Sequence, residues 1–295
     1  MTEIKSILVT GSNGQLGRSL KKIAKHYHQY EINFATRAEL DLSKRDSIAN
    51  FFEDKQFDLI INCAAYTAVD KAESEAELAD QVNHHAVRQI AEIATHKQVK
   101  LIHISTDYVF NGQQYRPYIE TDNVDPQGVY GLTKLKGEQA VLEAMANNAL
   151  IIRTSWVYSE FGHNFVKTML KLASDRDSLN VIFDQIGTPT YATDLAKTIM
   201  EMVQRESFQH NVSNNIVHYS NEGVCSWYDF AQTIFELSNI PCDVSPIETK
   251  DYPTAATRPH YSLLNKAKIK QHYQLTIPYW KDSLRTCLKA LQENS

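Results

Sequence analysis

A tyrosine and a lysine four residues apart, Tyr130 and Lys134, stand in a stretch with helical periodicity. Residues at this spacing share one helix face, so the phenol and the ammonium group can reach one pocket. A tyrosine has a pKa near ~10, and a close cation lowers it toward neutrality, which suits general acid–base catalysis. Roughly one such pair arises by chance in a chain like this. A helix with a solvated lysine is therefore the equal alternative, and the rest of the chain must decide.

A glycine-rich segment of the kind that binds nucleotide cofactors opens the chain. An apolar strand predicted over residues 4–10 runs into Gly11-Ser12-Asn13-Gly14-Gln15-Leu16-Gly17, and a helical pattern follows. Glycines permit a tight turn and a close approach of the backbone to a pyrophosphate at the helix N-terminus. The spacing Gly-x-x-Gly-x-x-Gly resembles the extended short-chain dehydrogenase/reductase superfamily. A turn that binds no ligand is the alternative.

The resemblance to this superfamily implies a catalytic trio of Ser or Thr, then Tyr, then Lys. Thr106 ends a strand predicted over residues 101–105 and stands 24 residues before Tyr130, with Ser105 as the weaker candidate. The glycine loop, the hydroxyl at a strand end and the Tyr-x-x-x-Lys pair occur in the expected order. We therefore predict a reductase site with Thr106, Tyr130 and Lys134 as its catalytic residues, the last two also contacting the cofactor.

The choice between NAD and NADP depends on the end of the second strand, predicted over residues 32–35. An acidic residue there favours NAD, whereas an arginine accommodates the 2′-phosphate of NADP. Arg37 occupies this place, so we predict NADPH, with NADH as an accepted second cofactor; a surface arginine is the alternative. Asp41 and Leu42 follow, at the place where related reductases have residues beside the adenine.

Small residues follow the next buried strand, predicted over residues 59–62, where a cofactor could approach the backbone. Ala64, Ala65 and Tyr66 are predicted to contact it. A long helix is predicted over residues 75–96. Asn83 within that helix resembles the asparagine that the superfamily keeps near its active site, and a buried structural asparagine explains it equally well.

Five longer runs resemble one family of this superfamily, the dTDP-4-dehydrorhamnose reductases. They are AYTAVDKAE (65–73), STDYVF (105–110), RTSWVY (153–158), DQIGTPT (184–190) and RPHYSL (258–263). The resemblance implies NADPH-dependent reduction of the 4-keto group of dTDP-4-dehydro-L-rhamnose to dTDP-L-rhamnose, a precursor of bacterial surface polysaccharide such as lipopolysaccharide. The substrate contacts predicted on this basis are Thr67, Val69, Thr106, Tyr108, Trp156, Asn164 and Arg258.

Three of these residues also have a physical reason to bind a nucleotide sugar. Trp156 leaves a strand end and can stack on a sugar, or else fill the core. Asn164 can cap the helix that follows it while contacting the substrate. The planar guanidinium of Arg258 suits bidentate pairing with a diphosphate, the alternative being an exposed loop arginine.

The alternation of strands and helices predicts an α/β fold, a Rossmann-like doubly wound parallel sheet with a smaller C-terminal substrate-binding lobe. We assign residues 1–155 to the NAD(P)-binding domain, with later segments returning to it, and residues 156–295 mainly to the lobe. In that second half, short strands at 181–182 and 216–219 alternate with helices at 192–204 and 227–238.

Composition limits the partners. The net charge of −5 argues against a nucleic-acid or anionic membrane surface, and no apolar run reaches the length of a membrane span. Four distant cysteines without a Cys-x-x-Cys pair, and no signal peptide after Met1, predict a cytoplasmic protein with reduced thiols. We expect a dTDP-sugar as the partner and a monomer or homodimer.

No metal site is predicted. The eleven histidines are scattered, and the pairs His26/His28 and His84/His85 are interpreted as surface polar residues. Some members of the family bind Mg²⁺ through acidic residues, one of them on the first helix, but this chain has Arg18-Ser19-Leu20 there.

Two rival functions remain open at this stage. A nucleotide-sugar epimerase or 4,6-dehydratase shares the superfamily, but a dehydratase typically reads Thr-Asp-Glu where this chain has Thr106-Asp107-Tyr108. A non-catalytic regulatory subunit, like that of methionine adenosyltransferase, resembles these reductases and acts by contact. The intact trio, Trp156 and Arg258 favour the enzyme.

Overall fold

A six-stranded parallel sheet forms the centre of the computed structural model, which describes residues 3–145, 147–210 and 215–293. Its order is β2-β1-β3-β4-β5-β10. The strands are β1 (Ser6–Thr10), β2 (Glu31–Phe34), β3 (Leu59–Asn62), β4 (Lys100–Thr106), β5 (Ala149–Thr154) and β10 (Asn215–Tyr219). Most are near-continuous apolar runs, as expected for strands covered on both faces. β2 and β3 flank β1, so a ligand crevice is expected at the carboxyl end of β1.

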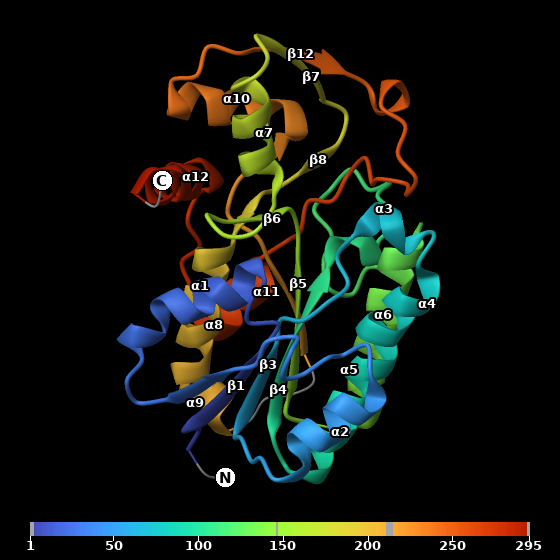
Figure 1. Cartoon of the computed structure of the whole chain (residues 1–295), viewed down its shortest axis with the longest axis vertical. Helices are drawn as coiled ribbons and strands as arrows, with labels where there is room; N and C mark the ends of the chain where they lie inside the picture. Colours follow the sequence, from blue (N-terminus) through green and yellow to red (C-terminus); the bar gives the residue numbers. More distant parts are fainter. Residues whose placement is uncertain (1–2, 146, 211–214, 294–295) are drawn as a thin grey trace.

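Helices cover both faces of the sheet (Figure 1). The helices on one face are α1 (Gln15–Ile23), α8 (Ala192–Gln204) and α11 (Ala267–Tyr273). The helices on the other face are α2 (Arg45–Glu53), α5 (Ala86–His96) and α6 (Val129–Ala144). Apolar side chains at helical spacing, such as Leu195, Ile199 and Met202 of α8, are fully buried against the strands. This doubly wound arrangement confirms the predicted fold class.

Three further helices and three short strand pairs gather beyond the carboxyl ends of the main sheet, in the upper part of Figure 1. They surround a hydrophobic core of their own, in which Tyr158, Phe230 and Trp280 are buried. The helices are α7 (Phe165–Ala173), α10 (Trp227–Ser238) and α12 (Trp280–Glu293). The strand pairs are β7 (Ser178–Ile182) with β12 (Asp243–Ile247), β8 (Ile186–Gly187) with β11 (Cys225–Ser226), and β6 (Val157–Tyr158) with β9 (Thr190–Tyr191).

Several elements of the second half do not belong to this lobe. β10 pairs with β5 at the edge of the main sheet, α8 packs against α1, and α9 (Glu206–His210) and α11 contribute Phe208 and Ile269 to the hydrophobic core of that sheet. The functional division at residue 155 stays a prediction. Residues 1, 2, 294 and 295 at the ends of the assigned domains, including the Met1 used in the signal-peptide prediction, lie outside the described residues.

The long helix predicted over residues 75–96 is continuous but not uniform. It consists of α4 (Ala76–Asp80), a π-helical turn η2 (Gln81–His85) and α5. The short elements that complete the described chain are η1 (Ala24–His26), α3 (Val69–Ala72), η3 (Asp107–Val109), α9 (Glu206–His210) and η4 (Thr249–Asp251). Among the helices of the described ranges, none has the length and apolar character needed to cross a lipid bilayer.

Candidate active site

The glycine loop follows β1 and leads into α1. Gly11 has a φ of +62°, and a Cβ placed on it would stand 2.7 Å from the backbone of Ala64. A Cβ on Gly17 would stand 2.5 Å from the carbonyl oxygen of Gly11. Only glycine fits both places, so the loop draws the ends of β1 and β3 together. Gly14 caps α1 without a side-chain hydrogen bond, and the first turn carries no acidic residue, which fits a pyrophosphate.

The predicted trio meets where β4 ends and α6 begins. Thr106 is the last residue of β4, and its hydroxyl donates to Asp107 Oδ1 at 2.9 Å. Tyr130 is in the first turn of α6, its ring edge-on to Tyr108 with centroids 5.4 Å apart. Lys134 follows one turn later and is 2% exposed. The structure therefore brings Thr106, Tyr130 and Lys134 to one place.

The pKa of Tyr130 differs in direction from the expectation. Burial raises it to about 12, a hydrogen bond with Thr106 lowers it, and the charge of Asp107 raises it further. The charge of Lys134 does not offset this rise; its Nζ donates to the carbonyl oxygen of Ile104 at 2.6 Å. The predicted depression toward neutrality is thus wrong for this structure. The phenol holds its proton, as a proton donor must.

A chain of buried polar side chains connects Lys134 to the glycine loop. His103 Nε2 lies 3.5 Å from Lys134 Nζ, and His103 Nδ1 lies 3.1 Å from the amide nitrogen of Asn62. Asn62 Oδ1 accepts from the hydroxyl of Thr10 at 2.6 Å, and Thr10 Oγ1 accepts from the backbone of Ala64. Burial and the charge of Lys134 hold the pKa of His103 well below its usual value. This network fixes Lys134 relative to β1 and β3.

A second buried group braces α6 against β5. Glu138 pairs with Arg153 through two contacts of 2.9 and 2.6 Å, and both side chains are almost fully buried. Ser105 donates to the same carboxylate at 2.5 Å, so its hydroxyl is engaged away from Tyr130. Burial lowers the pKa of Lys134 to about 8, an effect that Glu138 opposes. These contacts favour Thr106 over Ser105 as the catalytic hydroxyl.

The residues near the predicted cofactor site differ in their exposure to solvent. Arg37 is 76% exposed, and its Nε lies 3.4 Å from Asp41 Oδ1, so its guanidinium can meet a 2′-phosphate. Leu42 is buried. Asn83 is buried, accepts from the backbone of Tyr66 at 2.8 Å and donates to Thr133 beside Lys134. Asn83 therefore ties the segment after β3 to α6.

The predicted substrate residues come together from distant parts of the chain. Arg258 Nη2 lies 2.6 Å from Asp70 Oδ2, across 188 residues, which places Arg258 beside the segment that contains Thr67 and Val69. Backbone hydrogen bonds join three of the five runs, from Ser262 to Ile186 and from Thr190 to Trp156, and Tyr261 donates to Gly112, two residues past a fourth run. With the pair of Arg258 and Asp70, which reaches the fifth run, these contacts bring the runs together near the carboxyl ends of β4 and β5.

Two further predicted substrate residues have structural partners. Trp156, with a φ of +48°, stacks on Trp227 at 3.6 Å between ring centroids, and it remains partly exposed. Asn164 caps α7 by accepting from the backbone of Lys167, as predicted, and donates to Gln15 Oε1 at 3.0 Å. Through Gln15, Asn164 connects the lobe to the glycine loop.

Some groups in the site were not expected from the sequence. Asp107 is buried beside Thr106, and burial raises its pKa to about 6 against hydrogen bonds from Thr106 and Ser262. Asn62 and His103 interrupt apolar strands, and a polar residue inside a buried strand is the signal that could have identified them.

Comparisons with known proteins identify the family of this chain. The family model described as RmlD substrate binding domain matches residues 5–293. A dTDP-4-dehydrorhamnose reductase of Aggregatibacter actinomycetemcomitans is 41% identical over 286 residues, covering 95% of this chain and 97% of that protein.

Solved structures show the same relationship. A dTDP-4-dehydrorhamnose reductase of Clostridium acetobutylicum has a TM-score of 0.91 and 38% identity, with coverage of 97% of this chain and 99% of that one. Another reductase of this name, from Bacillus anthracis and determined in complex with NADP, has a TM-score of 0.91 and 36% identity. The match covers 97% of this chain and 99% of that one. The family resemblance predicted from the five runs is confirmed: this chain belongs to the RmlD substrate binding domain family, which it shares with these dTDP-4-dehydrorhamnose reductases.

Proposed function

We propose that this chain is an NADPH-dependent dTDP-4-dehydrorhamnose reductase, which reduces the 4-keto group of dTDP-4-dehydro-L-rhamnose to give dTDP-L-rhamnose. The observation that carries the proposal is the meeting of Thr106, Tyr130 and Lys134 where β4 ends and α6 begins, beside the family-like runs. Membership of the family supports the substrate, and the NADP complex of the Bacillus anthracis relative supports the cofactor.

The residues of the chain divide the work around the substrate carbonyl. NADPH, when bound, supplies the hydride. Tyr130, held protonated by its raised pKa, gives its proton to the carbonyl oxygen as negative charge develops there. Thr106 donates a second hydrogen bond to that oxygen. The ammonium group of Lys134 holds the nicotinamide ribose, and the exposed guanidinium of Arg37 pairs with the 2′-phosphate. Arg258 pairs with the diphosphate of the sugar nucleotide.

Two features support the reductase over the rivals. Tyr108 packs edge-on against Tyr130 in the place where a dehydratase would carry a glutamate, so this position offers no second acid–base carboxyl. The regulatory alternative needs no proton donor, whereas this site holds a protonated phenol beside a hydroxyl. We expect a monomer or homodimer, which sedimentation of the purified protein would decide.

The test is steady-state NADPH oxidation with dTDP-4-dehydro-L-rhamnose, measured beside NADPH binding by fluorescence. Tyr130→Phe removes one hydroxyl and keeps the ring, so turnover should fall by a factor of about 10² or more while NADPH binding persists. Tyr228→Phe, on α10 of the lobe, is the matched control and should behave as wild type. Wild-type protein that binds NADPH without turning over the sugar would establish the regulatory role instead. Equal turnover in wild type and Tyr130→Phe would refute the assigned acid.

A further inference from the structure

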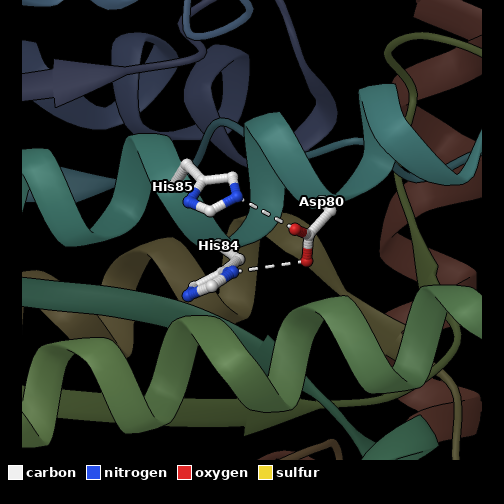
Figure 2. Close-up of side chains that lie close together, drawn as sticks. All are labelled: Asp80, His84 and His85. Atoms are coloured by element: carbon white, nitrogen blue, oxygen red, sulfur yellow. Dashed lines mark hydrogen bonds and ion pairs between the residues drawn. The ribbon is translucent and has the colours of Figure 1, made fainter.

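A polar cluster where α4 runs into the π-helical turn η2 gathers Asp80, His84 and His85 (Figure 2). His84 Nδ1 lies 3.3 Å from Asp80 Oδ1, and His85 Nε2 lies 3.1 Å from Asp80 Oδ2. One ligand atom from each side chain falls within 4.8 Å of the others. Asp80 and His84 are partly buried, with side chains 24% and 17% exposed. The reductase mechanism uses none of the three.

The π-helical turn η2 explains why two adjacent histidines can face one carboxylate. In an α-helix, the residue five positions after Asp80 would point about 140° away from it. A π-helical turn closes with i→i+5 hydrogen bonds and is wider, so His84 and His85 both come round to Asp80. Such single turns within α-helices are rare and frequently mark functional sites.

The donor set is that of a transition-metal site. Imidazole nitrogen suits Zn²⁺, Cu²⁺, Ni²⁺ and Fe²⁺, whereas Mg²⁺ and Ca²⁺ prefer oxygen ligands alone. With Zn–N and Zn–O bonds of about 2.0–2.1 Å, neighbouring ligands of a tetrahedral ion stand about 3.3 Å apart. Each histidine nitrogen lies at about this distance from one Asp80 oxygen, His84 Nδ1 at 3.3 Å from Oδ1 and His85 Nε2 at 3.1 Å from Oδ2, so a rotation of the carboxylate would bring the three donors around one ion.

We propose that Asp80, His84 and His85 form a binding site for one divalent transition-metal ion, with Zn²⁺ as the probe of choice. Lys136 of α6 competes with a metal ion for the carboxylate of Asp80, because its Nζ lies 3.1 Å from Asp80 Oδ1. Lys136 is 41% exposed, so its flexible side chain can turn to solvent when an ion binds. Asn83, within the same turn, holds Tyr66 and Thr133. A bound ion would therefore stiffen the support of the cofactor pocket.

The experiment is calorimetric titration of untagged, metal-free protein with ZnCl₂, repeated with MgCl₂. Wild type should bind about one Zn²⁺ and no Mg²⁺ at this site. Even an outer-shell partner typically contributes about 10–100-fold to metal affinity, so His84→Asn or Asp80→Asn should weaken binding at least tenfold. Lys136→Met should strengthen binding, because the competing cation is gone.

His163→Asn, an exposed histidine remote in the sequence, is the matched control and should leave the affinity unchanged. Circular dichroism of each metal-free variant verifies that it is folded. The proposal is overturned if wild type binds no Zn²⁺, or if His84→Asn and Asp80→Asn bind it as wild type does. Because the readout is binding, the outcome is independent of whether the reductase function is correct.

Discussion

The protonation state of Lys134 should make cofactor binding depend on pH. Burial lowers its pKa to about 8, so the ammonium form is complete only below that value. If Lys134 holds the nicotinamide ribose as proposed, NADPH affinity should fall as pH rises through about 8. Fluorescence titration of NADPH from pH 6.5 to 9.5 measures this. Lys134→Met should bind weakly at all pH values and lose the transition.

Lys136→Met is the control for that experiment, because Lys136 is two residues away on the same helix and points to Asp80 instead. It should retain the transition near pH 8. A wild-type affinity that stays constant across this range would show that the charge of Lys134 does not contribute to NADPH binding.

Asp107 makes an unusual contribution to stability, because its pKa is raised in the folded protein to about 6 from a usual value of 3.8. The folded state then holds this proton more tightly than the unfolded state does, so ionisation costs stability as pH rises between about 4 and 6. For a shift of this size the cost is about 3 kcal/mol. Asp107→Asn imitates the protonated form and avoids the cost.

Urea unfolding of wild type and Asp107→Asn at several pH values measures the effect as a difference, in which the other carboxyl groups cancel. The variant should gain stability relative to wild type as pH rises from 4 to 7. Asp54→Asn, an exposed loop carboxyl, should show no such trend. A constant difference between Asp107→Asn and wild type would contradict the raised pKa.

At the scale of elements, the segment around Arg258 is held to α3 by one ion pair and one backbone contact. Asp70 accepts from Arg258 and from the backbone of Ala256. The diphosphate is remote from the reacting carbon and changes little at the transition state. Arg258→Ala should therefore raise KM for the nucleotide sugar more than it lowers kcat.

Steady-state kinetics with the nucleotide sugar varied at saturating NADPH test this. Arg116→Ala is a suitable control, because Arg116 also forms a loop ion pair, with Asp122, but is not assigned to the substrate. A collapse in kcat with KM unchanged would place Arg258 at the reacting carbon instead.

The sequence predicted elements well where one pattern decides the structure. The helices at 192–204 and 227–238 match α8 and α10 to the residue, because their apolar spacing and the Ser226 capping box are local signals. The π-helical turn was not predicted, because a register shift of one residue leaves the apolar pattern of the 75–96 helix almost unchanged.

At the scale of the whole molecule, motif order predicted three residues that the structure brings together, Thr106, Tyr130 and Lys134. Contacts between residues far apart in the chain could not be predicted in this way. The pairing of Asp70 with Arg258 spans 188 residues and has no local signal. The pKa of Tyr130 was predicted in the wrong direction, because the spacing of Tyr130 and Lys134 does not reveal burial or the competing acceptor on Ile104. Both depend on tertiary packing.

The position of β10 has a consequence for how the chain is made. β5 ends at Thr154, yet β10, its neighbour at the sheet edge, begins only at Asn215. During synthesis from the N-terminus, one edge of β5, with the apolar residues Leu150, Ile151 and Ile152, lacks its native partner until about sixty further residues have emerged. An uncovered apolar strand edge is an aggregation hazard. A chain whose synthesis stops within α8 would therefore be prone to strand-to-strand association through β5. Once β10 docks, this edge of β5 is paired.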